Sequence, residues 1–308
     1  IRTIKQVPND AHYPKQWHYP AINLPQAWDL TTGTPDIGDV IVAVIDTGVV
    51  LNHEDLNGKL VSGYDFISDP SNSADNDGID SNPDDPGDGD QVGTSSWHGT
   101  HVAGTIAAET NNSIGVAGVS WGAKIMPLRA LGPQGGTDYD IGQAALFAAG
   151  LANDSSTVPS QKADIINMSL GGGVSQILDE AVLKAAKATG AYFVLAAGND
   201  GDDASNHSPA RTNGENIWTI SAIGLLDAEN NHTNAMPSWS NWGSSVDYAA
   251  PGVDIFSLWK NGETKTISGT SMAAPHACAI IMRTKNNQSS VGTVINDPDG
   301  TPDPVIHY

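Results

Sequence analysis

The chain has 308 residues, enough for one sizeable α/β domain with its own core, and no apolar run is long enough to span a membrane. Its 35 acidic residues against 14 Lys and Arg give a formal net charge of −21, which excludes nucleic acid and anionic membranes as partners because both attract positive surfaces. The single cysteine, Cys278, excludes an internal disulfide framework.

The first forty residues mix proline, aromatic and polar side chains, and this mixture predicts an arm (1–39) laid over the surface rather than a regular element. Residues 40–45 follow as a continuous apolar run, which predicts a parallel strand buried on both faces. The run ends at Asp46, so a carboxylate lies at the C-terminal edge of the predicted sheet, where open α/β sheets gather their active sites. Asp46 could also be no more than the cap of a turn.

Residues 69–96 form an insertion that is dense in Asp, Asn, Gly and Pro. Within it, residues 75–80 read Asp-Asn-Asp-Gly-Ile-Asp, and carboxylates at alternate positions around a glycine suit a hard cation that needs several converging oxygens. No Glu closes the twelve-residue pattern of an EF-hand. We favour calcium over the alternative, a solvated acidic loop.

Residues 97–105 predict the start of a small-residue helix that carries His98 and His101. Histidines three apart could share a helical face and bind zinc, but Gly99 stands where the His-Glu-x-x-His pattern of zinc proteases has its Glu. A histidine at a helix start, flanked by glycine, is better suited to act as a general base beside a substrate. We therefore assign that role to His98.

The rest of the chain alternates strand-like and helix-like runs. Thr137 predicts a helix N-cap and Gly190 a helix end. Strands are expected at 124–131, 165–170, 192–196, 217–223 and 246–249, and helices at 138–152 and 175–189. Alternation without repeats or a linker predicts a single doubly wound α/β domain over 1–308, with a mostly parallel central sheet flanked by helices.

Residues 269–276, Gly-Thr-Ser-Met-Ala-Ala-Pro-His, place Ser271 among small residues at the start of a further helix. Backbone N–H groups at a helix start can face a developing negative charge, which suits a nucleophile. Asp46, His98 and Ser271 follow one another in one of the three known chain orders of the same catalytic geometry. The stretch lacks the Gly-x-Ser-x-Gly elbow of esterases, because Ala273 replaces the last glycine.

These segments resemble the subtilisin-like serine proteases (subtilases) over roughly residues 10–282. Residues 44–49, 98–105 and 269–276 match the three catalytic signatures of that family, and residues 169–171 and 196–199 match its substrate-binding strands. The resemblance implies an enzyme with the same α/β fold. It also implies that Ser271 attacks a peptide carbonyl, that His98 transfers the proton, and that Asp46 holds the His98 tautomer.

The resemblance further implies that Asn199 donates a side-chain N–H to the oxyanion, together with the Ser271 backbone N–H. Protein and peptide substrates would bind in an extended conformation, with broad specificity, along the strand edges at 169–171 and 131–136. The loop 200–210 would close a specificity pocket that tolerates basic as well as apolar side chains. The implied substrate-binding residues are Ser169, Leu170, Gly171, Gly135, Ala196, Ala197, Gly198 and His207.

Calcium is the cofactor that the resemblance implies, with no catalytic cofactor. One site would use the side chains of Asp10, Asp55 and Asn112 with the carbonyls of Glu109, Ile114 and Val116. A second site, in the acidic insertion, would use Asp65, Asp75, Asp77 and Asp80 with the carbonyl of Ile79. Bound ions would stabilise the folded form.

We therefore expect a secreted, calcium-stabilised endopeptidase that acts as a monomer, in its mature form after removal of a signal and a pro-segment. A pro-segment or a proteinaceous inhibitor is a further expected partner. The alternative is a catalytically silent calcium-binding or adhesion module on the same scaffold. Residues 283–308 form an atypical C-terminal tail, in which the helix that follows in the family is not evident, and Cys278 is expected to be buried and inert.

Overall fold

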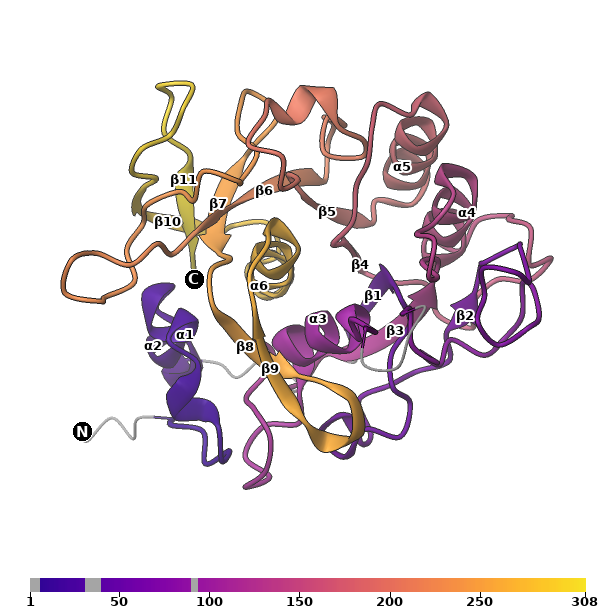
Figure 1. Cartoon of the computed structure of the whole chain (residues 1–308), viewed down its shortest axis with the longest axis horizontal. Coiled ribbons are helices and arrows are strands. Elements are labelled where there is room, and N and C mark those ends of the chain that lie inside the picture. Colours follow the sequence, from indigo (N-terminus) through magenta and orange to yellow (C-terminus); the bar gives the residue numbers. More distant parts are fainter. Residues whose placement is uncertain (1–5, 31–39, 90–93) are drawn as a thin grey trace.

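The computed structural model describes residues 6–30, 40–89 and 94–308 (Figure 1). Its centre is a nine-stranded sheet in the order β10-β11-β7-β6-β5-β4-β1-β3-β2. All neighbouring strands run parallel except β10 and β11. The strands are β1 (Ile41–Asp46), β2 (Tyr64–Asp65), β3 (Lys124–Arg129), β4 (Ile165–Met168), β5 (Tyr192–Ala196), β6 (Ile217–Ile223), β7 (Tyr248–Pro251), β10 (Ser289–Thr293) and β11 (Pro304–His307).

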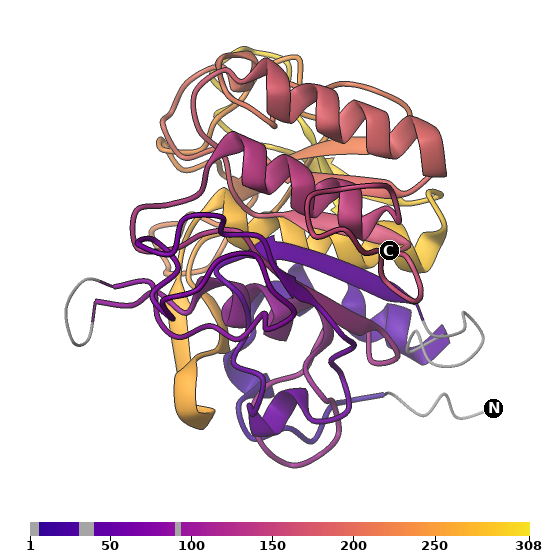
Figure 2. The same ribbon diagram turned by 90° about the vertical axis from the view of Figure 1, so that its right-hand side faces the viewer.

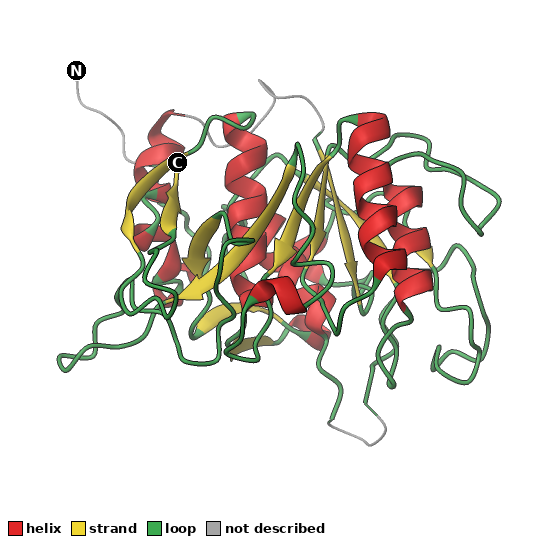
Figure 3. Ribbon diagram, turned by 90° about the horizontal axis from the view of Figure 1, so that it is seen from above, coloured by secondary structure: helices red, strands yellow, loops and turns green. Residues whose placement is uncertain are grey.

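Helices flank this sheet on both faces (Figure 3). The helices α3 (His98–Ala107) and α6 (Thr270–Thr284) pack in one core, and α4 (Asp138–Ala148) and α5 (Gln176–Thr189) pack in the other, where Figure 2 shows them side by side. Strand β1 contributes to both cores, because Val42 and Val44 point to the first core and Ile41, Ala43 and Ile45 point to the second. The predicted doubly wound α/β architecture is confirmed.

The local signals set most element boundaries. Thr137 Oγ1 accepts a hydrogen bond from Asp140 N and begins α4, while Gly190 ends α5 in the left-handed conformation, with φ +67°. The last predicted strand lies two residues further on, in β7. In the described ranges, no helix combines the length and apolar character needed to cross a membrane.

The N-terminal residues correct the prediction of an irregular surface arm. Residues 6–30 contain the helices α1 (His18–Ala21) and α2 (Leu24–Leu30), and residues 31–39 lie outside the described part. Tyr19 and Trp28 are buried in the core, and their polar atoms donate to the carbonyls of Ala117 and Val119. Aromatic side chains with satisfied polar ends pack as core, so this segment is part of the domain body.

The C-terminal residues add a strand pair to the sheet. β10 and β11 pair antiparallel, and β11 lies parallel to β7 with Val305 opposite Ala249. Val305 and Ile306 are fully buried. These two apolar residues anchor a tail whose composition is otherwise polar, so composition alone did not predict this strand pair. A separate hairpin, β8 (Ile255–Leu258) and β9 (Thr264–Ile267), lies beside α3.

Candidate active site

Asp46 and His98 form a hydrogen-bonded pair at the C-terminal edge of the sheet. Asp46 is the last residue of β1 and is fully buried, while His98 is the first residue of α3. The Asp46 Oδ1 atom lies 2.7 Å from His98 Nδ1 and also accepts the backbone N–H of Thr47 at 2.8 Å. The pair therefore fixes one face of the imidazole and leaves Nε2 as the atom available for chemistry.

The charge of Asp46 also controls the ionisation of His98. Burial disfavours the imidazolium, but the charge and hydrogen bond of Asp46, helped by Asp88 and Asp85, outweigh burial and hold the pKa of His98 above its ordinary value. Proton transfer to Nε2 is favoured by this shift. Because a general base must begin neutral, the group is lost for that role as pH falls through the raised pKa.

Part of the acidic insertion supports this pair from behind. Thr47 Oγ1 donates to Asp85 Oδ2 at 2.7 Å and accepts the Gly99 backbone N–H at 3.1 Å, so it joins the insertion to the start of α3. Burial raises the pKa of Asp85 to about 6. Asp85 is 3% exposed. The insertion is therefore not simply a solvated loop.

His101 has a structural position rather than a place in the cleft. It is fully buried, its Nε2 atom lies 3.1 Å from the carbonyl oxygen of Ile255 and 3.2 Å from that of Lys265, and burial lowers its pKa to about 3. These contacts tie α3 to the β8–β9 hairpin. The two histidines of the motif thus have separate roles.

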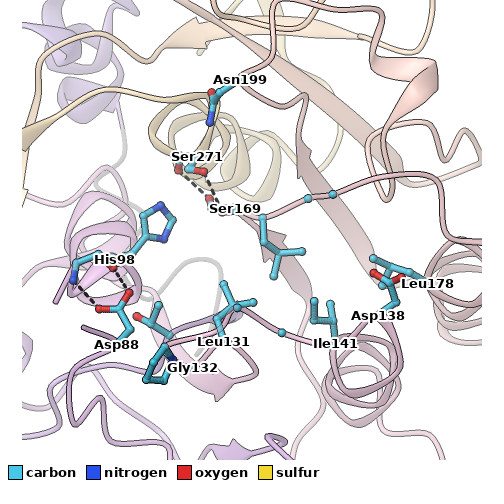
Figure 4. Close-up of a pocket in the computed structure, with 18 residues that line it drawn as sticks. Asp88, His98, Leu131, Gly132, Asp138, Ile141, Ser169, Leu178, Asn199 and Ser271 are labelled. Atoms are coloured by element: carbon cyan, nitrogen blue, oxygen red, sulfur yellow. Dashed lines mark hydrogen bonds between the residues drawn. The ribbon is translucent and has the colours of Figure 1, made fainter. Parts of the chain in front are cut away.

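Ser271 lies in the first turn of α6, across from His98 (Figure 4). Within the described residues its hydroxyl donates to the Ser169 carbonyl oxygen at 2.9 Å, and no hydrogen bond joins it to His98. Pro275 has no N–H to bond the carbonyl four residues before it, so the Ser271 carbonyl is open to the Ser169 hydroxyl at 2.7 Å. The hydrogen bond between Ser169 and the Ser271 carbonyl joins α6 to the residue that follows β4.

Asn199 presents its amide nitrogen to the same pocket. Its Oδ1 atom accepts from both the backbone N and the Oγ1 of Thr270, at 2.8 and 3.0 Å. With the oxygen held in this way, Nδ2 faces Ser271 (Figure 4). Thr270, the residue that precedes Ser271, thus orients the Asn199 side chain so that its N–H groups are free to donate into the cleft.

His98, Ser271 and Asn199 all line one cleft of about 560 Å³. Ser169, Leu170 and Gly171 line one wall and Gly135 the other, and all four belong to the predicted substrate-binding set. Residues 132 and 135 close a tight turn by reciprocal backbone hydrogen bonds, and Asn72 of the insertion donates to the Gly135 carbonyl at 2.8 Å. The insertion therefore also supports a cleft wall.

A side pocket of about 360 Å³ meets the cleft at Ser271 and Asn199. Its walls are mostly Gly and Ala, so it has room for a large side chain. His207 lies at this pocket, with its ring nitrogens 3.6 Å from Asp200 and 3.3 Å from Asp202. The predicted residues that line it are Leu170, Gly171, Ala196, Ala197, Gly198 and His207.

The first predicted calcium set comes together in the structure. Asp55 accepts from Asn112 Nδ2 at 2.7 Å and from Val116 N at 2.8 Å, and Asp10 accepts from Asn112 N at 3.2 Å. Ile114 N donates to Asn112 Oδ1. Burial raises the pKa of Asp10, and raises that of Asp55 to about 6, and among the described residues neither carboxylate pairs with Lys or Arg. The two carboxylates are buried and face no Lys or Arg among the described residues, which is a charge arrangement that calcium would complete, while Ile114 lies exposed at the edge of the set.

Glu109 differs from the other residues of that set, since its carboxylate faces Lys59 at 3.5 Å and only its carbonyl would be a ligand. In the described ranges, no three Asp, Glu, His or Cys side chains lie close enough to hold a metal ion. A calcium ion here would therefore need amide and main-chain oxygens to complete its shell.

The second predicted set contains a cation of the protein itself. Arg129, which is buried, pairs with both Asp65 and Asp75 and donates to the Ser73 carbonyl. Asp65 and Asp80 face each other through backbone hydrogen bonds, whereas Asp77 is exposed and Ile79 is half-buried. Arg129 places one positive charge between two of the four carboxylates, so part of the charge that a metal would balance is already balanced here, unlike in the first set.

Comparison with known proteins identifies the family of this chain. Residues 38–295 match the model of the subtilase family. This chain belongs to the subtilase family. It is 39% identical to an extracellular protease of Xanthomonas campestris over 89% of this chain and 48% of that protein, and 36% identical to thermitase of Thermoactinomyces vulgaris over 89% and 83%. An extracellular basic protease of Dichelobacter nodosus is 38% identical over 94% and 50%.

Solved structures agree with this subtilase assignment. A protease of Pseudoalteromonas arctica superposes with a TM-score of 0.82 at 39% identity, covering 91% of this chain and 87% of that one. A cold-adapted subtilisin-like serine proteinase gives 0.66 at 35% identity, covering 89% and 90%. The chain spans about half the length of the Xanthomonas and Dichelobacter relatives.

Three residues at the site were not anticipated from the sequence. Thr270 orients Asn199, Asp85 supports Thr47, and Asp88 lines the cleft while accepting two hydrogen bonds from Ser96 at 2.5 Å. One signal in the sequence could have pointed to Thr270, since it immediately precedes Ser271. Asp85 and Asp88 had no such signal, since they lie in a loop that contains many other Asp residues.

Proposed function

We propose that this subtilase is a secreted serine endopeptidase, stabilised by calcium, that cleaves proteins and peptides with broad specificity as a monomer. The observation that carries the proposal is the facing arrangement of the Asp46–His98 pair and Ser271 across one cleft, with Asn199 beside Ser271. The names of the relatives support secretion, since two are called extracellular. A catalytically silent module would have no need of the oriented Asn199 amide.

In the proposed reaction the Ser271 hydroxyl turns from Ser169 to His98 Nε2 once substrate is in place, because catalytic hydrogen bonds often form only then. Ser271 Oγ attacks the peptide carbonyl carbon and its proton passes to Nε2. Asn199 Nδ2 and the Ser271 backbone N–H donate to the resulting oxyanion. His98 then protonates the leaving amine, and water hydrolyses the acyl-enzyme by the same route.

The side pocket would set the preference for the residue on the acyl side of the cleaved bond (P1). Its Gly and Ala walls admit large apolar side chains, and Asp200 at its edge would accept a basic one. We expect serine-inhibitor-sensitive turnover of peptide anilides with Phe, Leu, Lys or Arg at this position, measured as kcat/KM over a panel that differs only there. Turnover that resists serine-directed inhibitors would contradict the protease mechanism, and failure of Lys and Arg alone would contradict only the acidic contribution.

Calcium would bind at the Asp10–Asp55–Asn112 set and stabilise the fold. At a concentration 100 times Kd, one site contributes about 2.7 kcal/mol, which is roughly 5 °C in Tm for a domain of this size. We expect a chelator to lower Tm by about this amount, measured on the Ser271→Ala variant so that autolysis does not interfere. Asp55→Asn should lose the calcium response, whereas Asp227→Asn, at an exposed acid elsewhere, should keep it. An unchanged Tm in chelator would overturn the calcium proposal.

A pro-segment or a proteinaceous inhibitor is the further partner proposed for the cleft, since its strand edges at 131–136 and 169–171 would accept any extended chain.

A further inference from the structure

The turn that carries Asn199 has a backbone that needs outside support. It follows β5 and passes through two left-handed positions, Gly198 at φ +107° and Gly201 at φ +64°. Ala197 N still donates to the Ile220 carbonyl of β6, and the residues after it leave the sheet. They lie instead against residues 238–243, a segment between β6 and β7.

Asn241 makes most of the side-chain contacts between the two segments. Its Nδ2 atom donates to the Ala197 carbonyl at 3.0 Å, and its Oδ1 accepts the backbone N–H groups of Asp200 at 2.9 Å and Asp202 at 3.1 Å. Its own backbone N–H donates to the Gly198 carbonyl at 2.9 Å. These four hydrogen bonds enclose Asn199 on both sides along the chain.

The fit around Asn241 leaves little freedom. Its side chain is fully buried, and a Cβ atom at Gly198 would lie 2.3 Å from its Nδ2. The site needs a short side chain that donates on one atom and accepts on another, and only an asparagine-like amide does both. Leucine has a similar size but would leave three backbone groups without this partner, of which the Ala197 carbonyl is buried and the N–H groups of Asp200 and Asp202 are part-buried.

We propose that Asn241 is a positioning residue that fixes the Asn199 turn so that Nδ2 meets the oxyanion. This inference rests on the proposed role of Asn199. Thr270 holds the Asn199 side chain from α6, and Asn241 holds the backbone of the residues that precede and follow Asn199. A misplacement of about 1 Å at such a group can cost 10²-fold in rate.

The test compares Asn241→Leu in two backgrounds, wild type and Asn199→Ala, with kcat and KM measured on a peptide anilide. Asn199→Ala alone should lower kcat by 10²–10³-fold, on the order found for an oxyanion donor in this family. In wild type, Asn241→Leu should lower kcat by about 10–10²-fold and leave KM within about threefold. In the Asn199→Ala background the same change should alter kcat by no more than about twofold, because the donor to be positioned is already gone.

The control is Asp247→Asn, which disturbs a part-buried hydrogen bond from the Thr219 backbone N–H outside the turn and should affect Tm more than kcat. Where Asn241→Leu does not fold, Asn241→Ser serves in the same cycle. A kcat loss of equal size in both backgrounds, or no loss in wild type, would overturn the positioning role. Unchanged kcat in Asn199→Ala would instead refute the oxyanion role itself, so the two failures are distinguishable.

Discussion

Ser271→Ala is expected to lower kcat on a peptide anilide by about 10⁶-fold, the magnitude measured for loss of this serine in the same family. The variant removes the atom that forms the acyl-enzyme, and none of the remaining groups can replace it. Binding and the oxyanion donors remain, so a residual acceleration of about 10³–10⁴ over water is expected. KM should change little, because the hydroxyl contributes its energy in the transition state.

The matched control is Ser96→Ala, at a serine that lines the same cleft and donates to Asp88 rather than to a reacting atom. It should retain activity within about tenfold. A serine-directed covalent inhibitor should label wild type and Ser96→Ala, but not Ser271→Ala. More than about 1% residual kcat in Ser271→Ala, above contaminating protease, would contradict the assignment of the nucleophile.

The groups that could be found from the sequence are those whose chemistry is local. Asp46, His98 and Ser271 each end a strand or lie at the start of a helix, and glycines near them stand where other chain segments approach closely. A Cβ at Gly99 would lie 2.1 Å from the Gly48 carbonyl oxygen, so the glycine that follows His98 marks tight packing beside Asp46. Such signals occupy a few consecutive residues, and the parallel sheet then brings them to one edge.

The supporting contacts could not be found in this way. Asp85 lies 38 residues from Thr47, and Asn241 lies 39 to 44 residues from the backbone groups that it holds. No local pattern distinguishes Asp85 from the other acids of its loop. Whether a carboxylate braces a strand end, pairs with Arg129 or faces solvent is decided by tertiary packing, and that packing also turned part of the predicted calcium ligand set into ion pairs.

Asp46→Asn is expected to lower kcat by about 10⁴-fold, because it removes the charge that stabilises the His98 imidazolium in the transition state. Asp46 Oδ1 accepts from both Thr47 N and His98 Nδ1, while Oδ2 is buried and accepts no hydrogen bond from the described residues. An asparagine that keeps its oxygen toward His98 buries an NH₂ without an acceptor. An asparagine rotated by 180° about its side-chain bond places its NH₂ donor against the Thr47 N–H, which is also a donor. Neither orientation restores the charge.

The pH profile gives the same variant a second readout. Asp46 raises the pKa of His98, so its neutralisation should move the acid limb of kcat/KM to lower pH, since His98 must be neutral to accept the Ser271 proton. Asp85→Asn is the comparison, because Asp85 also raises that pKa but makes no hydrogen bond to the imidazole within the described structure. Its loss in kcat should stay within about tenfold. Equal losses in the two variants would mean that long-range charge, and not the Asp46–His98 contact, carries the effect.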